Sequence, residues 1–174
     1  MIQTTVYKSL TKKIFLNGIA MLILFLVGIA AKAQEDPPRP LKVTTFQNLS
    51  FGAFIQGNTG GQVIIDPQGN RSLNGDLIPV YLGYQYYPAI FETEAIPGSV
   101  ITILNGPDIT LTGNHGGTLS MHLGASIPPS PYISTTNPPF KTQVRIGGTL
   151  YVGTMLNNPS GDYIGYFSVT FVQQ

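Results

Sequence analysis

After residue 41 the sequence alternates between apolar and polar side chains, and this alternation restricts the fold more than any other feature. Leu119, Met121 and Leu123, for example, are separated by Ser120 and His122. Successive side chains of a β-strand point to opposite faces, so a period of two predicts strands that each bury one face. Nowhere after residue 34 do apolar residues recur at the three- and four-residue spacing of an amphipathic helix. The sequence therefore predicts an all-β domain.

The predicted strands are short and are separated by turn formers. They lie at 41–45, 62–65, 89–95, 100–104, 109–112, 119–123, 150–152 and 160–171. The expected turns are Asn74-Gly75, Asn105-Gly106, Asp66–Asn70, Asn114–Gly117 and Asn157-Asn158-Pro159. We expect roughly nine or ten strands, packed as an immunoglobulin-like β-sandwich of two sheets. Segment 100–104 is apolar except for Thr102 and is expected to be fully buried, and Pro128–Pro139 to form a long loop or edge segment.

The first 33 residues have the features of a secretory signal peptide. Lysines precede an apolar run at 19–31, and Ala31-Lys32-Ala33 provides the small side chains that signal peptidase requires. An uncleaved membrane anchor is the alternative, because the apolar run approaches the length of a spanning helix. We expect cleavage after Ala33 and export to the periplasm, the outer cell surface or the extracellular space, with no membrane insertion after cleavage.

The exported part is divided into an arm and a domain. Residues 34–41 contain three prolines and are expected to be an extended, mobile arm before a sandwich domain at 42–174. Five basic and eight acidic residues follow the leader, which gives the exported part a net charge of −3. This charge argues against a nucleic-acid partner, which attracts basic surfaces. The chain has no cysteine, so disulfides and thiol chemistry are excluded.

The sequence offers no catalytic or metal-binding constellation, and we expect no enzyme activity and no cofactor. His115 and His122 are the only histidines, and they have no cysteine and no carboxylate close in sequence to complete a metal site. Glu92 and Glu94 lie on one face of a strand, about 7 Å apart, and this spacing is superficially like that of a glycosidase pair. However, the chain has no tryptophan to form a sugar-binding cleft, so solvated surface glutamates are the favoured interpretation.

Two groups of residues are candidates for recognition. The first is a tyrosine cluster that is suited to stacking on sugars or docking proteins, although half-buried strand tyrosines are the more ordinary interpretation: Tyr81, Tyr84, Tyr86 and Tyr87. The second is the closing strand, which is largely apolar on both faces; Tyr163, Phe167, Val169 and Phe171 share one of them. Such a strand is hazardous at an open edge, so it must be covered within its own domain or pair with another chain.

Several segments resemble the exported bacterial domains of domain-of-unknown-function family 4402. They are Leu49–Gly52, Gly60–Arg71, Pro88–Phe91, Pro97-Gly98, Ile146–Gly153 and the glycine-spaced closing strand Gly161–Thr170. The chain is similar, more distantly, to spore-coat-U-type proteins and chaperone–usher pilin subunits. This resemblance implies an immunoglobulin-like sandwich at the cell envelope and no assigned activity. The chain differs from many pilin-type relatives in lacking a disulfide and in ending Phe171-Val172-Gln173-Gln174.

We therefore expect a non-catalytic structural or adhesive envelope protein that acts by surface contact or strand exchange. Its partners would be copies of itself or other envelope proteins, joined by β-strand addition. A carbohydrate-binding module that uses the tyrosine cluster is the alternative.

Overall fold

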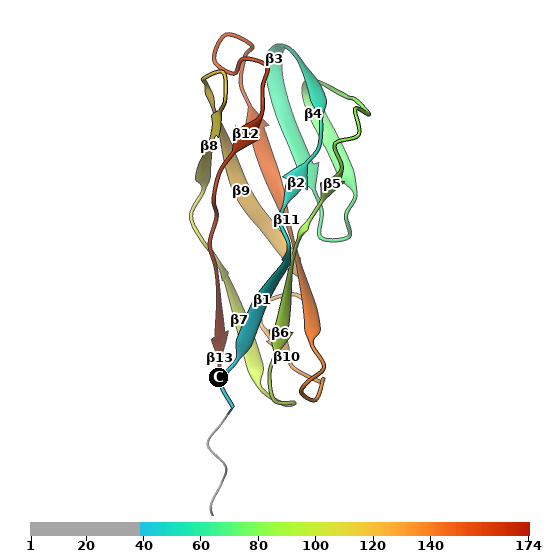
Figure 1. Ribbon diagram of the computed structural model, residues 1–174, viewed down its shortest axis with the longest axis vertical. Helices are drawn as coiled ribbons and strands as arrows, with labels where there is room; N and C mark the ends of the chain where they lie inside the picture. The colour runs from blue at the N-terminus through green and yellow to red at the C-terminus, as the bar shows by residue number, and fades with distance from the viewer. Residues whose placement is uncertain (1–38) are drawn as a thin grey trace, which may run out of the picture. The chain divides into compact units, whose positions relative to one another are not determined.

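The computed structural model describes residues 39–174, so the predicted signal peptide and most of the predicted arm lie outside the described residues. The described part consists of antiparallel strands and contains no helix, and hence none long and apolar enough to cross a membrane (Figure 1). The strands are β1 (Lys42–Gln47), β2 (Ser50–Phe51), β3 (Phe54–Ile65), β4 (Arg71–Pro79), β5 (Tyr86–Tyr87), β6 (Ala89–Glu94), β7 (Val100–Asn105), β8 (Ile109–Gly113), β9 (Thr118–Ile127), β10 (Tyr132–Ile133), β11 (Thr142–Val152), β12 (Tyr163–Ile164) and β13 (Val169–Gln173).

The larger sheet is built around β11. One side of β11 pairs with β9, which continues to β8 and β12. The other side is shared, because the first half of β11 pairs with β6 and the second half with β3. β1 extends the sheet beyond β6, and β4 extends it beyond β3. Thus β1, β4 and β12 are its edge strands.

The second layer is a three-stranded sheet in the order β10-β7-β13, with a further short pair formed by β2 and β5. Two segments pass between the layers. β7 lies in the small sheet and β8, which follows it, lies in the large one; β12 and β13 make the reverse passage and pair with β8 and β7. These two paired segments therefore connect the sheets side by side along the molecule (Figure 1).

The core lies between the layers and follows the predicted alternation. Leu119, Met121 and Leu123 of β9 are each less than 5% exposed, and Val144 and Ile146 of β11 are fully buried. Ala89, Phe91, Thr93 and Ala95 occupy alternate positions of the predicted strand 89–95, and all four are buried. The Phe91 ring meets the Phe171 ring edge-on across the layers, with 5.5 Å between centroids.

The strand order matches the immunoglobulin-like layout in the main sheets. That layout has strands A, B, E and D in one sheet and C, F and G in the other. Here β1-β6-β11-β9 follows the order A-B-E-D, and the β7–β13 pair corresponds to C and F. The all-β sandwich prediction is thus confirmed, with additional strands where β3 and β4 widen the sheet.

Four details differ from the sequence-based expectation. There are thirteen strands rather than nine or ten, because β2, β4, β5 and β10 have no counterpart among the predicted ranges and the closing strand is divided into β12 and β13. Asn74-Gly75 is not a turn but lies inside β4, next to a register shift in its pairing with β3. Leu104 is 51% exposed, so segment 100–104 is buried on one face only. The strand predicted at 160–171 is not continuous, since residues 165–168 leave it to cross between the sheets.

Candidate functional site

The inner face of the closing segment belongs to the core. Tyr163, Phe167, Val169 and Phe171, the predicted strand-pairing residues, are partly buried and pack against the core. The Tyr163 hydroxyl donates a hydrogen bond to the carbonyl oxygen of Pro159 at 2.7 Å, and burial raises the pKa of this phenol. Their first role is therefore to close the sandwich.

The outer face of the same segment is open to solvent and carries no charged side chain, and it presents three apolar side chains together with Ser168 and Thr170. Ile164, Tyr166 and Val172 are 66%, 90% and 38% exposed. Leu104 lies opposite Thr170 on the neighbouring strand and is exposed on the same outer face. β7, β10 and β13 contain no charged residue. Within the closing segment, β12 is an edge strand of the large sheet and β13 is an edge strand of the small sheet. In the described part of the chain, each of them therefore pairs with a neighbouring strand on one side only.

The four predicted recognition tyrosines do not form one cluster. Tyr86 packs against the core, and the Arg71 guanidinium carbon lies 4.4 Å from its ring centroid. Arg71 also donates hydrogen bonds to the carbonyl oxygens of Phe51 and Ala53. This arrangement makes Tyr86 a structural residue that anchors β5 to β4 and β2.

The remaining tyrosines are accessible. Tyr81 and Tyr84 lie in the loop between β4 and β5 and are 85% and 63% exposed, and Leu82 between them is 71% exposed. Tyr87 lies on β5 and is 36% exposed. The loop therefore presents an aromatic and apolar surface, made chiefly by Tyr81, Leu82 and Tyr84.

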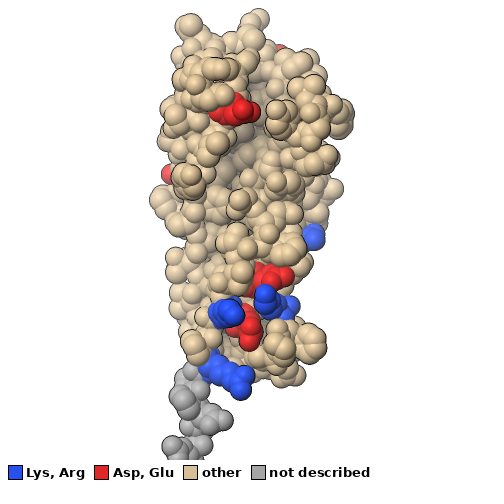
Figure 2. Space-filling model, viewed as in Figure 1, with Lys and Arg blue, Asp and Glu red and all other residues tan. Residues whose placement is uncertain are grey.

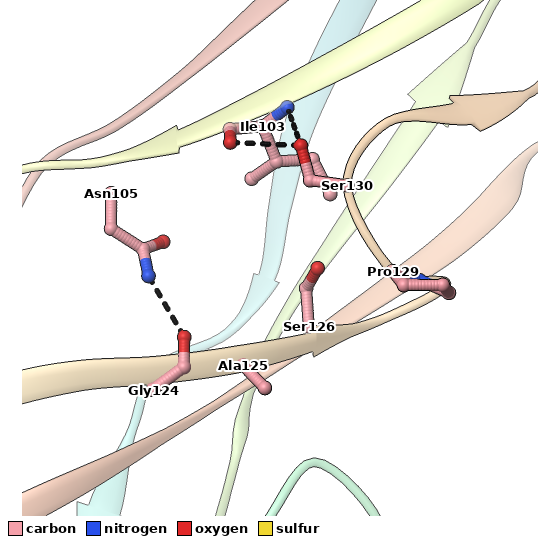
Figure 3. Close-up of a pocket in the computed structure, with 7 residues that line it drawn as sticks. All are labelled: Ile103, Asn105, Gly124, Ala125, Ser126, Pro129 and Ser130. Carbon is pink, nitrogen blue, oxygen red and sulfur yellow. Dashed lines mark hydrogen bonds between the residues drawn. The ribbon is translucent and has the colours of Figure 1, made fainter.

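A pocket of about 320 Å³ opens between the two layers, where β9 extends past the end of its pairing with β8 (Figure 3). Its lining residues are Ile103, Asn105, Gly124, Ala125, Ser126, Pro129 and Ser130. None of these side chains titrates, which leaves the pocket without an acid, base or ionised nucleophile.

Polar side chains in this pocket satisfy backbone groups that lack a strand neighbour. The Ser130 hydroxyl accepts a hydrogen bond from the Ile103 amide at 2.7 Å and donates one to its carbonyl oxygen at 3.0 Å. The Asn105 side-chain amide donates to the carbonyl oxygen of Gly124 at 2.8 Å (Figure 3). The sequence assigned Asn105 only to a turn and did not single out Ser130, because the partners of both residues lie far away in the chain.

The histidines are surface residues with local partners. His122 Nδ1 lies 2.6 Å from Asp108 Oδ1, and both side chains are more than half exposed. The sequence did not reveal this pair, since the turn after β7 brings Asp108 alongside β9. His115 Nδ1 lies 2.8 Å from the carbonyl oxygen of Ser160. Among residues 39–174 no three potential metal ligands gather.

The two glutamates of β6 each lie next to a lysine of a neighbouring segment. Glu92 Oε2 lies 2.7 Å from Lys141 Nζ, and Glu94 is opposite Lys42 on β1. On the face shown in Figure 2, charged side chains gather toward the end at which the described chain starts, and most of the remaining surface is uncharged. This arrangement supports the interpretation of Glu92 and Glu94 as surface residues.

The comparisons with known proteins identify a family but no function. No curated protein and no solved structure has significant similarity to the chain. A family model described as a domain of unknown function (DUF4402) matches residues 41–172, which is most of the chain and nearly all of the described sandwich. The chain therefore belongs to the DUF4402 family.

Proposed function

We propose that this protein is an exported, non-catalytic structural or adhesive component of the cell envelope that acts through its sandwich surface and sheet edges. The observation that carries this proposal is the closing segment, which has an uncharged, largely apolar outer face and an edge position in both sheets. Natural sheet edges are usually protected by lysines, prolines or bulges, and an edge strand without them favours contact with another chain. The leader-like first 33 residues support export.

Expression of the full chain in a bacterial host tests export. We expect the protein outside the cytoplasm, with Gln34 as its first residue in N-terminal sequencing. Retention in the membrane fraction with the leader attached would instead identify the alternative, an anchored protein.

Sedimentation velocity of residues 34–174 tests the contact surface. We expect concentration-dependent association that is lost in the variant I164T/Y166T/V172T, because these three side chains are the apolar part of the outer face. The variant should still fold, since the three exposed side chains do not contribute to the core. A matched control, I55T/I78T, changes two exposed isoleucines that pair with each other on β3 and β4. A protein that stays monomeric and does not bind isolated cell envelopes contradicts the proposal.

Comparison of residues 34–174 with residues 42–174 separates two modes of association. If the arm is exchanged between copies, only the longer form associates. Equal association of both forms excludes arm exchange and leaves contact through the sandwich itself.

A carbohydrate-binding role for the loop of Tyr81 and Tyr84 is the second candidate, supported by the exposure of both rings. Exposed aromatic rings can stack on sugars. A glycan array with wild type and Y81A/Y84A tests it: a hit that the double variant loses supports the role, and a hit that it retains excludes these two rings.

A further inference from the structure

The immunoglobulin-like layout has one position that no described strand fills. The A-B-E-D sheet is complete in β1-β6-β11-β9, and β7 and β13 supply C and F. Strand G would lie beside β13, on the side away from β7. Within residues 39–174 nothing pairs with that edge, because the small sheet ends at β13.

The register shows which backbone groups face this edge. Gln174 and Val100 exchange two hydrogen bonds, and Ser168 accepts one from Gly106, so even-numbered residues of β13 bond to β7. In an antiparallel pair, the residues between such bonded pairs point their N–H and C=O groups away from the partner. The N–H and C=O groups of Val169, Phe171 and Gln173 therefore face the open edge.

The other edge of β7 supports this assignment. Ile103 lies opposite Phe171 and has the same alternation, so its N–H and C=O groups point away from β13. Both of them bond to the Ser130 hydroxyl. One edge of the β7–β13 pair is thus satisfied by a side chain, while the edge of β13 has no equivalent partner in the described chain.

The inner face of β1 is uncovered beside this edge. Val43 and Thr45 lie directly opposite Thr93 and Phe91, and directly opposite residues share a face of the sheet. Thr93 and Phe91 are buried beneath the small sheet, yet Val43 is 39% exposed and Thr45 is also exposed. β1 therefore extends past the cover that the small sheet provides.

The β13 edge and the uncovered inner face of β1 make one site, which we call the β13–β1 seam. Phe171 links its two sides, since its ring packs on Phe91 of β6, the strand paired with β1. In Figure 1 both β1 and β13 run to the end of the molecule at which the C-terminus is marked. A single strand added beside β13 would pair with its free backbone groups and would cover Val43 and Thr45.

We propose that the β13–β1 seam binds one extended segment of a partner protein, with apolar side chains at every second position and no charge on the inward face. This inference rests on the proposed function and names the kind of partner that the contact protein takes. Backbone pairing would supply affinity, and the apolar positions that meet Val43, Val169 and Phe171 would supply specificity.

The arm at residues 34–41 is a poor occupant of the seam. Pro37, Pro38 and Pro40 have no N–H to offer to a ladder, and Glu35, Asp36 and Arg39 would bring charges to an apolar site. The β13 edge of a second copy is also a poor occupant. β13 is packed on the large sheet of its own copy, and that sheet would collide with β1 and β6 of the first copy if the two β13 edges paired. An isolated strand from a different chain avoids both problems.

The test uses residues 34–174 and a synthetic peptide of about ten residues in which valine alternates with threonine. A control peptide has proline at every second valine, which removes N–H groups from the ladder. Native-state hydrogen exchange by NMR gives a residue-specific readout. We expect the first peptide to slow exchange of the Val169, Phe171 and Gln173 amides, with little change at Thr170 and Val172, which already bond to β7.

Two variants of β1 provide the matched control. T45K places a long charged side chain on the inner face of the seam, and T44K places the same side chain on the outer face, opposite Glu92. We expect T45K to weaken peptide binding by ~10-fold or more and T44K to leave it within ~2-fold. Both positions are exposed in the free protein, so both variants should fold.

Three outcomes overturn the inference: no binding of the valine–threonine peptide, equal binding of the proline peptide, or protection at sites other than Val169, Phe171 and Gln173. Sedimentation velocity on the same samples separates this failure from failure of the proposed function. Association of the protein through Ile164, Tyr166 and Val172 without peptide binding rejects the seam alone.

Discussion

Thr93 and Tyr132 form a buried polar contact that joins the two layers. Thr93 Oγ1 lies 2.7 Å from the Tyr132 hydroxyl and 3.2 Å from the carbonyl oxygen of Thr142, and both residues are less than 10% exposed. The alternation of residues 89–95 placed Thr93 on the buried face. Its partner was not predictable, because Tyr132 belongs to the proline-rich segment, where no period exists.

Removal of the Thr93 hydroxyl should reduce the free energy of unfolding more than removal of the Tyr132 hydroxyl. T93V leaves the Tyr132 hydroxyl buried without a partner, so we expect a loss of about 1–3 kcal/mol in the free energy of unfolding. Y132F leaves Thr93 bonded to Thr142, so we expect about 1 kcal/mol. Urea denaturation of both variants and the double variant measures this difference, and an equal or reversed order contradicts the assignment.

The same tyrosine should make stability sensitive to alkaline pH. Burial raises the pKa of Tyr132 above its usual 10.0, and its bond to Thr93 only partly offsets this effect. The folded state favours the neutral phenol, so this stabilisation is complete below pH 10 and is lost as the pH rises through the folded-state pKa. We expect Y132F to lose less stability than wild type between neutral pH and pH values above 10, as measured by thermal unfolding.

The β3–β4 hairpin shows where element prediction from sequence succeeds and where it fails. The turn at Asp66–Asn70 was predicted, and it is held by the Asn70 amide bonding to Asp66 Oδ1 at 2.8 Å. Asn74-Gly75 was misassigned as a turn, because Gly75 uses its positive φ of 83° inside β4, where the pairing with β3 shifts register. The dipeptide alone does not distinguish a turn from a bulge.

Gly75 and Gly83 form a matched pair for testing this bulge. Both have positive φ, but a Cβ on Gly75 would lie 2.6 Å from the Gly60 carbonyl oxygen, whereas a Cβ on Gly83 would have no neighbour within 4 Å. We expect G83A to cost about 1 kcal/mol from backbone strain alone, and G75A to cost about 3 kcal/mol or more. Equal costs in chemical denaturation would show that the crowding at the bulge is absent.

Alternation predicted the faces of the strands better than their partners. The buried sides of β6, β9 and the closing segment were all predicted, because each side chain's face depends only on the parity of its position. The layer crossings were not predicted, since they depend on close packing between segments that are distant in sequence. At Gly165 a Cβ would lie 3.1 Å from both the Thr110 carbonyl oxygen and Leu111 Cγ. The seam was also missed, because the exposure of Val43 depends on strands that are distant in sequence.

At the scale of the whole molecule, the two crossing segments couple the layers. β8 and β12 pair in the large sheet, and their continuations β7 and β13 pair in the small one. Detachment of β12 from the large sheet would pull on β13 in the small sheet, and detachment of β13 would pull on β12. The sandwich should therefore unfold as one cooperative unit.

Tryptophan probes test this coupling, because the chain has no tryptophan of its own. Y151W on β11 and I133W on β10 report on different sheets, and both replaced side chains are exposed. We expect the two variants to give the same urea midpoint and the same slope. Separate midpoints would show that the small sheet unfolds independently.

The placement of the first and last described strands also determines how the domain would respond to tension. Lys42 lies opposite Glu94, and Gln174 bonds to Val100, so both strands terminate beside the short connection at 95–99. A pull applied to these two points would act across the hydrogen bonds of β1 and β13 and would open them one after another, as a zipper opens. A strand seated between them would bridge the two strands that separate first, so an occupied domain should resist stretching better than an empty one.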